Sequence, residues 1–167
     1  RRDPMERPWA QCCGLLFDQP VGKRGVSVLS EPENLSHAIN KTYFQQFPEE
    51  VRPKTCISRN VEELKRFIEE QHDRVVIKPL QGSGGKNVFL VGTDERANLN
   101  KMLDAVLRDG YCASQEYWPA AAEGDVLLFV LIGCPLARGG KDAAFRRMTK
   151  TGDHGSTLTS VGVSGRG

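Results

Sequence analysis

One stretch decides the fold of this chain: Val75-Val76-Ile77-Lys78-Pro79-Leu80-Gln81-Gly82-Ser83-Gly84-Gly85-Lys86-Asn87-Val88-Phe89-Leu90-Val91. An apolar, β-branched run ends in a lysine, and a glycine-rich loop then leads directly into a second apolar run. Two strands joined by such a loop expose backbone N–H groups that form a nest suited to polyphosphate. Lys78 would add a positive charge to the same anion. A glycine-rich hairpin with a solvated lysine is the simpler alternative.

The spacing of these glycines excludes two familiar phosphate-binding loops. A Walker A loop opens a helix with G-x-x-x-x-G-K-[ST], but here Gly85-Lys86 is followed by Asn87 and a strand-like run. A dinucleotide-binding loop needs G-x-G-x-x-G before a helix, and the third glycine is missing. The loop is therefore predicted to lie over a phosphate as the flap of a β-hairpin.

The composition is that of an ordinary soluble protein. The 167 residues are 39% hydrophobic and 26% charged, enough to bury a core. A net charge of +2 is too small to indicate nucleic-acid binding. No apolar run approaches the ~18 residues that span a bilayer, and no signal peptide is seen. We therefore expect a cytoplasmic protein with neither a nucleic-acid nor a membrane partner.

The cysteines and the chain ends add two expectations. Five cysteines without a C-x-x-C pair argue against both a disulfide scaffold and a zinc site. The chain begins at Arg1 without a methionine and stops at Gly167, so we expect the central fragment of a longer enzyme. Residues 152–167, rich in Gly, Ser and Thr, are expected to form a mobile loop.

Hydrophobic periodicity predicts an α+β fold. Residues 1–24 should be irregular because prolines interrupt them. A helix is expected over 34–47, bent near Asn40, and another over 60–71, with Asn60 and Glu63 forming a capping box. A third starts at Asp94 or Asn98. Strands are predicted at 25–29, 54–58, 74–79, 87–91, 111–116, 126–132 and 143–148. The order β-α-β-β-α-β from Lys54 indicates a mainly antiparallel sheet.

Further candidate ligand-binding residues lie outside the glycine loop. Gln115-Glu116-Tyr117-Trp118 ends a predicted strand, where backbone could present a donor and an acceptor to a purine edge; a plain strand end explains it equally well. Lys41, after Asn40, is either a second phosphate-binding cation or a surface lysine. Asp125 could bind a ribose hydroxyl or sit in a turn.

Arg146 and its neighbour Arg147 should point to opposite faces of a strand. One guanidinium would then face the covered or active side and require an anion, such as a phosphate or a substrate carboxylate. A salt bridge to an internal carboxylate is the alternative.

In their order along the chain, these segments resemble the ATP-grasp superfamily, and within it the bacterial glutathione synthetase group. The similarity runs through nearly the whole chain and rests on five elements. They are Arg2-Asp3-Pro4 (R-x-D-P), Asn40-Lys41-Thr42-Tyr43-Phe44 (N-x-K-L-[YF]), Lys78-Pro79-Leu80 with Gly82-Ser83-Gly84-Gly85 (K-P-L-x-G-x-G-G), Gln115-Glu116-Tyr117-Trp118-Pro119 (Q-x-Y-x-P) and Gly124-Asp125.

The resemblance implies an ATP-grasp fold, in which two α+β subdomains grip the nucleotide. Residues 1–50 would be a linker and the end of a preceding substrate domain. Residues 51–116 would form the nucleotide-binding lid subdomain, and 117–167 an incomplete C-terminal subdomain with a mobile glycine-rich loop.

The resemblance also implies site residues and chemistry. ATP would phosphorylate the carboxylate of γ-glutamylcysteine, and glycine would attack the acylphosphate to form an amide. Mg²⁺ would bridge the phosphates, its E-x-N ligands lying beyond the end of this chain. Arg146 would be catalytic, and the nucleotide would be bound by Lys41, Lys78, Gly82, Ser83, Gly84, Gly85, Gln115, Glu116, Tyr117, Trp118 and Asp125.

Two departures from the family pattern keep alternatives open. Val126-Leu127 replace the usual Lys-Arg after Gly124-Asp125, and residues 155–165 lack the R-x-N-x-x-x-G-G run of the substrate loop. As a fragment, the chain is expected to be inactive alone. The alternatives are a degenerate module that binds ATP without catalysis and a glutamate-adding peptide ligase of the same superfamily. Self-association of the full-length enzyme is left open.

Overall fold

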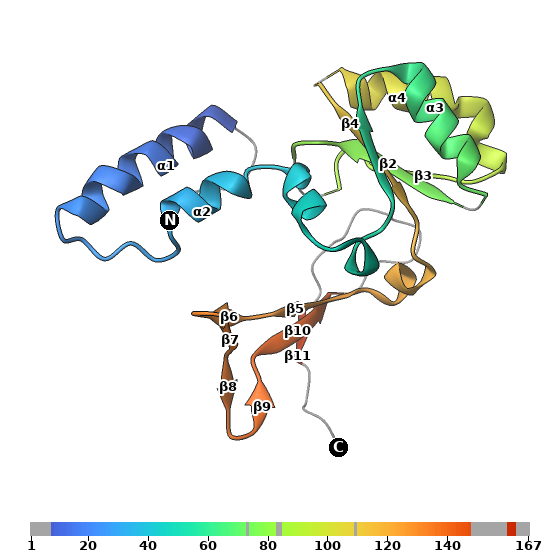
Figure 1. Cartoon of the computed structure of the whole chain (residues 1–167). Coiled ribbons are helices and arrows are strands. Elements are labelled where there is room, and N and C mark those ends of the chain that lie inside the picture. The colour runs from blue at the N-terminus through green and yellow to red at the C-terminus, as the bar shows by residue number, and fades with distance from the viewer. Residues whose placement is uncertain (1–7, 73, 83–84, 109, 148–159, 163–167) are drawn as a thin grey trace. The chain divides into compact units, whose positions relative to one another are not determined.

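The structure is a computed structural model that describes residues 8–72, 74–82, 85–108, 110–147 and 160–162 (Figure 1). It divides into two compact units, Arg1–Tyr117 and Trp118–Gly167. No helix in the described ranges has the length and apolar character needed to cross a membrane. All five cysteines are unpaired in this structure.

The first unit is built on a four-stranded antiparallel sheet in the order β1-β4-β2-β3. Two helices, α3 and α4, cover one face of this sheet (Figure 1). The predicted order β-α-β-β-α-β is therefore confirmed. The elements are β1 (Thr55–Ser58), α3 (Val61–Glu70), β2 (Val75–Pro79), β3 (Phe89–Val91), α4 (Leu99–Leu107) and β4 (Cys112–Glu116).

Alternation along the strands separates a core face from the face that carries the candidate site. Val75 and Ile77 of β2 are fully buried against the two helices, whereas Val76 and Lys78 point to the opposite face. The helices contribute buried side chains at helical spacing. With β3 and β4 they form one core: Leu64, Ile68, Val75, Ile77, Val91, Leu103, Val106 and Cys112.

Helix α3 begins at a side-chain cap that the sequence predicted. The Asn60 Oδ1 atom accepts hydrogen bonds from the N–H groups of Glu62 and Glu63, at 2.9 and 3.4 Å. The capping box closes through a third side chain. The Ser58 hydroxyl accepts the Asn60 N–H at 2.9 Å and donates to the Glu63 carboxylate at 2.6 Å.

Two predictions for the N-terminal part are wrong. Helix α1 (Pro8–Lys23) occupies most of the segment predicted to be irregular. Pro8 is its first residue, where a missing N–H costs nothing, and Pro20 lies in its last turn. The strand predicted at 25–29 does not form. Gly25, with φ 84°, follows the helix in a turn, and residues 26–28 pair with no strand in the described part of the chain.

The helix predicted over 34–47 is two shorter elements, α2 (Pro32–His37) and the 3-10 helix η1 (Lys41–Gln46). The break lies at Asn40, as predicted. Asn40 is extended, and its Oδ1 caps η1 by accepting from the Thr42 N–H at 2.9 Å. A second 3-10 helix, η2 (Glu49–Val51), precedes β1, and η3 (Asp94–Asn98) leads into α4.

The second unit contains a three-stranded antiparallel sheet in the order β11-β10-β5. The predicted pairing of residues 143–148 with the preceding apolar strand is confirmed, but that strand is broken at Phe129. The Phe129 N–H donates to Ala143 and its carbonyl accepts from Leu136, so the chain changes partner there. The mobile loop predicted at 152–167 lies outside the described residues, apart from β11. Besides η4 (Pro119–Glu123), the elements are β5 (Asp125–Leu128), β6 (Val130–Leu131), β7 (Cys134–Pro135), β8 (Ala137–Arg138), β9 (Lys141–Asp142), β10 (Ala144–Arg147) and β11 (Ser160–Gly162).

Candidate functional site

The glycine-rich loop connects two hydrogen-bonded antiparallel strands, as predicted. Register pairs Val75 with Val91 and Ile77 with Phe89, so the loop is the tip of a β-hairpin. Gly82 and Gly85 have φ of 109° and 75°, a region that favours glycine. Ser83 and Gly84 lie outside the described residues. Gly82 and Gly85 thus adopt backbone conformations that other residues rarely adopt.

Lys78 lies one residue before the end of β2, on the sheet face opposite the helices. Its ammonium donates to the Gln115 Oε1 atom at 2.6 Å. Burial, with the nearby positive charge of Lys41, lowers the pKa of Lys78 to about 8. Lys86, at the far end of the same loop, is exposed. Lys78 is therefore partly desolvated, whereas Lys86 is solvated.

Lys41 reaches the root of the same loop from η1. Its ammonium donates to the carbonyl oxygens of Pro79, Leu80 and Gly82, at 2.8, 3.3 and 3.2 Å. Burial lowers the pKa of Lys41 as well. The partners that the structure gives to Lys41 and Lys78 are all neutral oxygens. Among the described residues, neither positive charge beside the loop has a carboxylate partner, which leaves both able to attract an anion.

The predicted purine-binding segment has two of its backbone donors already engaged in the sheet. The Glu116 N–H donates to the Lys54 carbonyl at 2.9 Å, and the Tyr117 N–H donates to the Arg74 carbonyl at 3.1 Å. The Glu116 carboxylate accepts the Lys54 N–H at 3.1 Å and so holds the start of β1. The side chain of Gln115, by contrast, accepts a hydrogen bond from Lys78, a candidate phosphate-binding residue.

Three predicted site residues belong to the second unit. Trp118 is partly exposed and precedes η4. Asp125 starts β5, and Arg146 is an exposed residue of β10 that faces Val126 across the strand pair. Their proposed roles with the base, the ribose and the substrate remain predictions.

Sequence reasoning missed the residues that hold the two lysines. Thr55 accepts a hydrogen bond from Gln115 Nε2 at 3.0 Å, although 60 residues separate them. Pro79 and Leu80 act through their carbonyls, which no side-chain motif can indicate. The pairing of β1 with β4 brings Thr55 opposite Gln115. The predicted order of strands and helices was therefore the sequence feature that could have indicated this contact.

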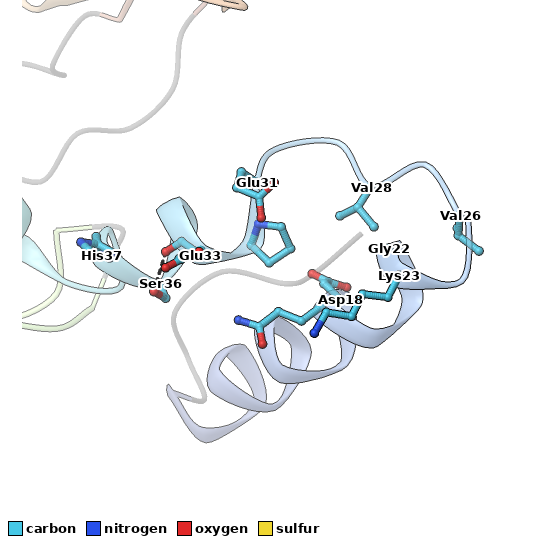
Figure 2. A pocket seen from close by; sticks show the side chains of 11 residues that line it. Asp18, Gly22, Lys23, Val26, Val28, Glu31, Glu33, Ser36 and His37 are labelled. Atoms are coloured by element: carbon cyan, nitrogen blue, oxygen red, sulfur yellow. Dashed lines mark hydrogen bonds between the residues drawn. The ribbon is translucent and has the colours of Figure 1, made fainter.

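A separate pocket of about 830 Å³ lies between α1, α2 and the segment that joins them (Figure 2). Charges of both signs line it, from Asp18, Lys23, Glu31 and Glu33, and His37 also lines it. It contains neither the paired lysines nor the glycine-rich loop, so we assign it no part in nucleotide binding. Within the described residues, no three His, Cys, Asp or Glu side chains gather closely enough to hold a metal ion.

These features define a class: a two-layer α+β unit with a glycine-rich β-hairpin and two desolvated lysines at its root. Residues 40–166 match the model of the prokaryotic glutathione synthetase ATP-grasp domain. The chain belongs to this family, and the predicted resemblance and ATP-grasp fold are confirmed.

Individual relatives agree with the family match. The chain is 34% identical over 114 residues to a glutathione synthetase of Vibrio cholerae, covering 67% of this chain and 35% of the relative. It is 37% identical over 111 residues to one of Thermosynechococcus vestitus, covering 65% and 34%. The match to the Escherichia coli K12 enzyme is 31% over 116 residues, covering 68% and 36%. The chain thus spans about a third of the length of these relatives.

Proposed function

We propose that this chain supplies the nucleotide-binding part of an ATP-dependent carboxylate–amine ligase that makes glutathione from γ-glutamylcysteine and glycine. The observation that carries the proposal is the pair Lys41 and Lys78 at the root of the glycine-rich loop, with neutral oxygens as their partners. The family membership and the names of the relatives support the choice of reaction. The proposal also includes a cytoplasmic location and the division of the chain into a linker (1–50), a nucleotide-binding lid subdomain (51–116) and an incomplete C-terminal subdomain (117–167).

In this proposal the two ammonium groups bind oxygens of the ATP phosphates. Each charge-assisted hydrogen bond contributes about 1.5–3 kcal/mol. The glycine-rich flap, Gly82 to Gly85, covers the phosphates with its N–H groups and keeps water from the acylphosphate. Because the Glu116 and Tyr117 N–H groups are engaged in the sheet, we assign the backbone donor for the purine to Trp118. Asp125 binds the ribose, and Arg146 binds a substrate anion.

The reaction transfers the terminal phosphoryl group of ATP to the carboxylate of the acid, which releases ADP. The amine then attacks the acyl carbon, the amide C–N bond forms, and inorganic phosphate leaves. The lysines stabilise the negative charge on the migrating phosphoryl group. Mg²⁺ would accompany ATP and neutralise part of that charge. Because the described residues supply no ligand set for Mg²⁺, we derive no step through it.

Calorimetric titration of the chain with MgATP tests nucleotide binding, and saturable binding is expected. Turnover is tested with the complete protein encoded by the gene, by measuring ADP while γ-glutamylcysteine or glycine is omitted in turn. We expect ADP only when both are present. Turnover that needs glutamate as the amine would retain the ligase class and contradict glutathione synthesis. No ATP binding by either protein would contradict the whole proposal.

A second candidate is a module that binds ATP without catalysis. It is favoured by Val126-Leu127, which stand where the family usually has two basic residues; Val126 is 56% exposed on β5. An aliphatic side chain there cannot bind a substrate carboxylate. Tight ATP binding by the complete protein, without ADP release for any pair of acid and amine, would establish this second function.

A further inference from the structure

We propose that Thr55 is a positioning residue that fixes the ammonium of Lys78 for nucleotide phosphate by orienting the side-chain amide of Gln115. The inference deepens the proposed function and rests on it. Thr55, Gln115 and Lys78 lie on the neighbouring strands β1, β4 and β2. Register pairs Thr55 with Gln115, and places Lys78 opposite Ala113, two residues from Gln115. Since alternate residues share a face, all three side chains project from the face opposite the helices.

These side chains form one continuous line of hydrogen bonds. The Lys78 ammonium donates to Gln115 Oε1 at 2.6 Å. Gln115 Nε2 donates to Thr55 Oγ1 at 3.0 Å, and the Thr55 hydroxyl donates to the Pro53 carbonyl at 2.9 Å. Every member is at least partly buried, so water competes poorly for these groups.

The donors and acceptors in this line allow a single orientation of the amide. A carbonyl only accepts, so the one hydroxyl proton of Thr55 is committed to Pro53. Thr55 can then only accept from Gln115, and it must face the amide nitrogen. The amide oxygen is thereby turned to Lys78, whose ammonium only donates. In the reversed orientation, the NH₂ group of Gln115 would face the Lys78 ammonium, which is donor against donor. The amide oxygen would face the lone pairs of the Thr55 hydroxyl, which is acceptor against acceptor.

This orientation matters because a lysine side chain is long and flexible. Ordering it costs rotamer entropy, and the line of hydrogen bonds already orders the side chain before ATP binds. Thr55→Val keeps the shape of the side chain and removes the hydroxyl. The Gln115 amide then loses its acceptor and is no longer fixed at its nitrogen end, so its oxygen holds the Lys78 ammonium less firmly.

The test compares the unaltered 167-residue chain with Thr55→Val, Thr55→Ser and the control Thr93→Val, an exposed threonine beside η3. Thermal unfolding first verifies that each variant is folded. The pKa of Lys78 is then measured without nucleotide, by NMR of the chain carrying ¹³C,¹⁵N-labelled lysine, with Lys78→Arg for assignment. MgATP affinity is measured by calorimetry.

In Thr55→Val we expect the pKa of Lys78 to fall, because the amide oxygen that favours the ammonium is no longer held against it. ATP affinity should fall about 3- to 10-fold. Thr55→Ser retains the hydroxyl and should match the unaltered chain, as should Thr93→Val. An unchanged Lys78 pKa in folded Thr55→Val, or the same fall in Thr55→Ser, would overturn the inference. Absence of ATP binding by the unaltered chain would count against the proposed function, and the NMR comparison would still decide the role of Thr55.

Discussion

The ammonium nitrogen of Lys41 lies 2.8 Å from the carbonyl oxygen of Pro79, although 38 residues separate them in the chain. The same nitrogen contacts the carbonyls of Leu80 and Gly82, so its hydrogen bonds in the chain without nucleotide are made to the loop root. Before any nucleotide binds, Lys41 therefore ties η1 to the beginning of the glycine-rich loop.

Replacing Lys41 with methionine should loosen the loop root. The three carbonyls lose a common donor, so amide hydrogen exchange of residues 80–82 should accelerate and ATP affinity should fall about tenfold or more. Added ammonium ions should restore part of the affinity by occupying the same carbonyls. Lys65→Met, which removes an exposed ion pair with Glu62, is the control and should change neither measurement. Unaltered exchange in Lys41→Met would contradict this role.

Lys78 and Lys86, at opposite ends of the loop, should differ in their contribution to ATP binding. Lys78 is half-buried and already positioned, so Lys78→Ala should weaken binding about tenfold or more. Lys86 is exposed, and Lys86→Ala should cost about 1 kcal/mol or less. Calorimetric titration of both variants measures the difference. Equal losses would mean that the loop meets phosphate in another register.

ATP affinity should decrease as pH rises through about 8. The pKa of Lys78 is about 8 in the chain without nucleotide, and an adjacent phosphate would raise it. At pH 9 the amine is mostly neutral and must take up a proton to bind ATP, whereas at pH 7 it is already charged. Titrations in two buffers of different ionisation enthalpy report this proton uptake. Lys78→Met should bind weakly and with much less pH dependence; an identical pH profile would assign the effect to another group.

The same pKa predicts that Lys78 lowers stability at neutral pH. The pKa falls from 10.5 in the unfolded chain to about 8 in the folded one, so folding carries the cost of burying the charge below pH 8. Between pH 8 and 10.5 the unfolded chain binds more protons, and unfolding free energy should rise with pH. Lys78→Met should therefore be more stable at pH 7, by up to about 3 kcal/mol. The advantage should disappear near pH 10.5. Urea denaturation at both pH values checks this.

The serine that closes the cap of α3 should be important for stability. Ser58 is 8% exposed and accepts the Asn60 N–H while it donates to Glu63. Ser58→Ala leaves both groups without this partner and should cost about 1–3 kcal/mol in urea denaturation. Ser36→Ala removes an exposed hydroxyl that donates to the Glu33 carbonyl, and it should change stability by about 0.5 kcal/mol or less. Similar losses in the two variants would show that the cap adds nothing specific.

The sequence by itself determined the elements whose signal is local. Alternation in Val75–Pro79 and helical spacing in Val61–Glu70 predict their own structure, because each pattern needs one face buried. The glycines at 82 and 85 likewise predict the loop, since other residues rarely adopt positive φ. Local signals failed at α1, where Pro8 suggested irregular chain but stands at a helix start. The strand predicted at 25–29 failed because, within the described part of the chain, no strand pairs with it.

Only the tertiary structure decided how the two lysines are held. Lys41 depends on three backbone carbonyls, which are common to every residue type and carry no sequence signature. Lys78 depends on Gln115 and Thr55, which meet because β4 lies between β1 and β2. Burial then lowers the pKa of both amines, and burial is a property of the assembled unit. A lysine in a motif indicates where a phosphate could bind, whereas strand pairing sets the position and charge state of its ammonium.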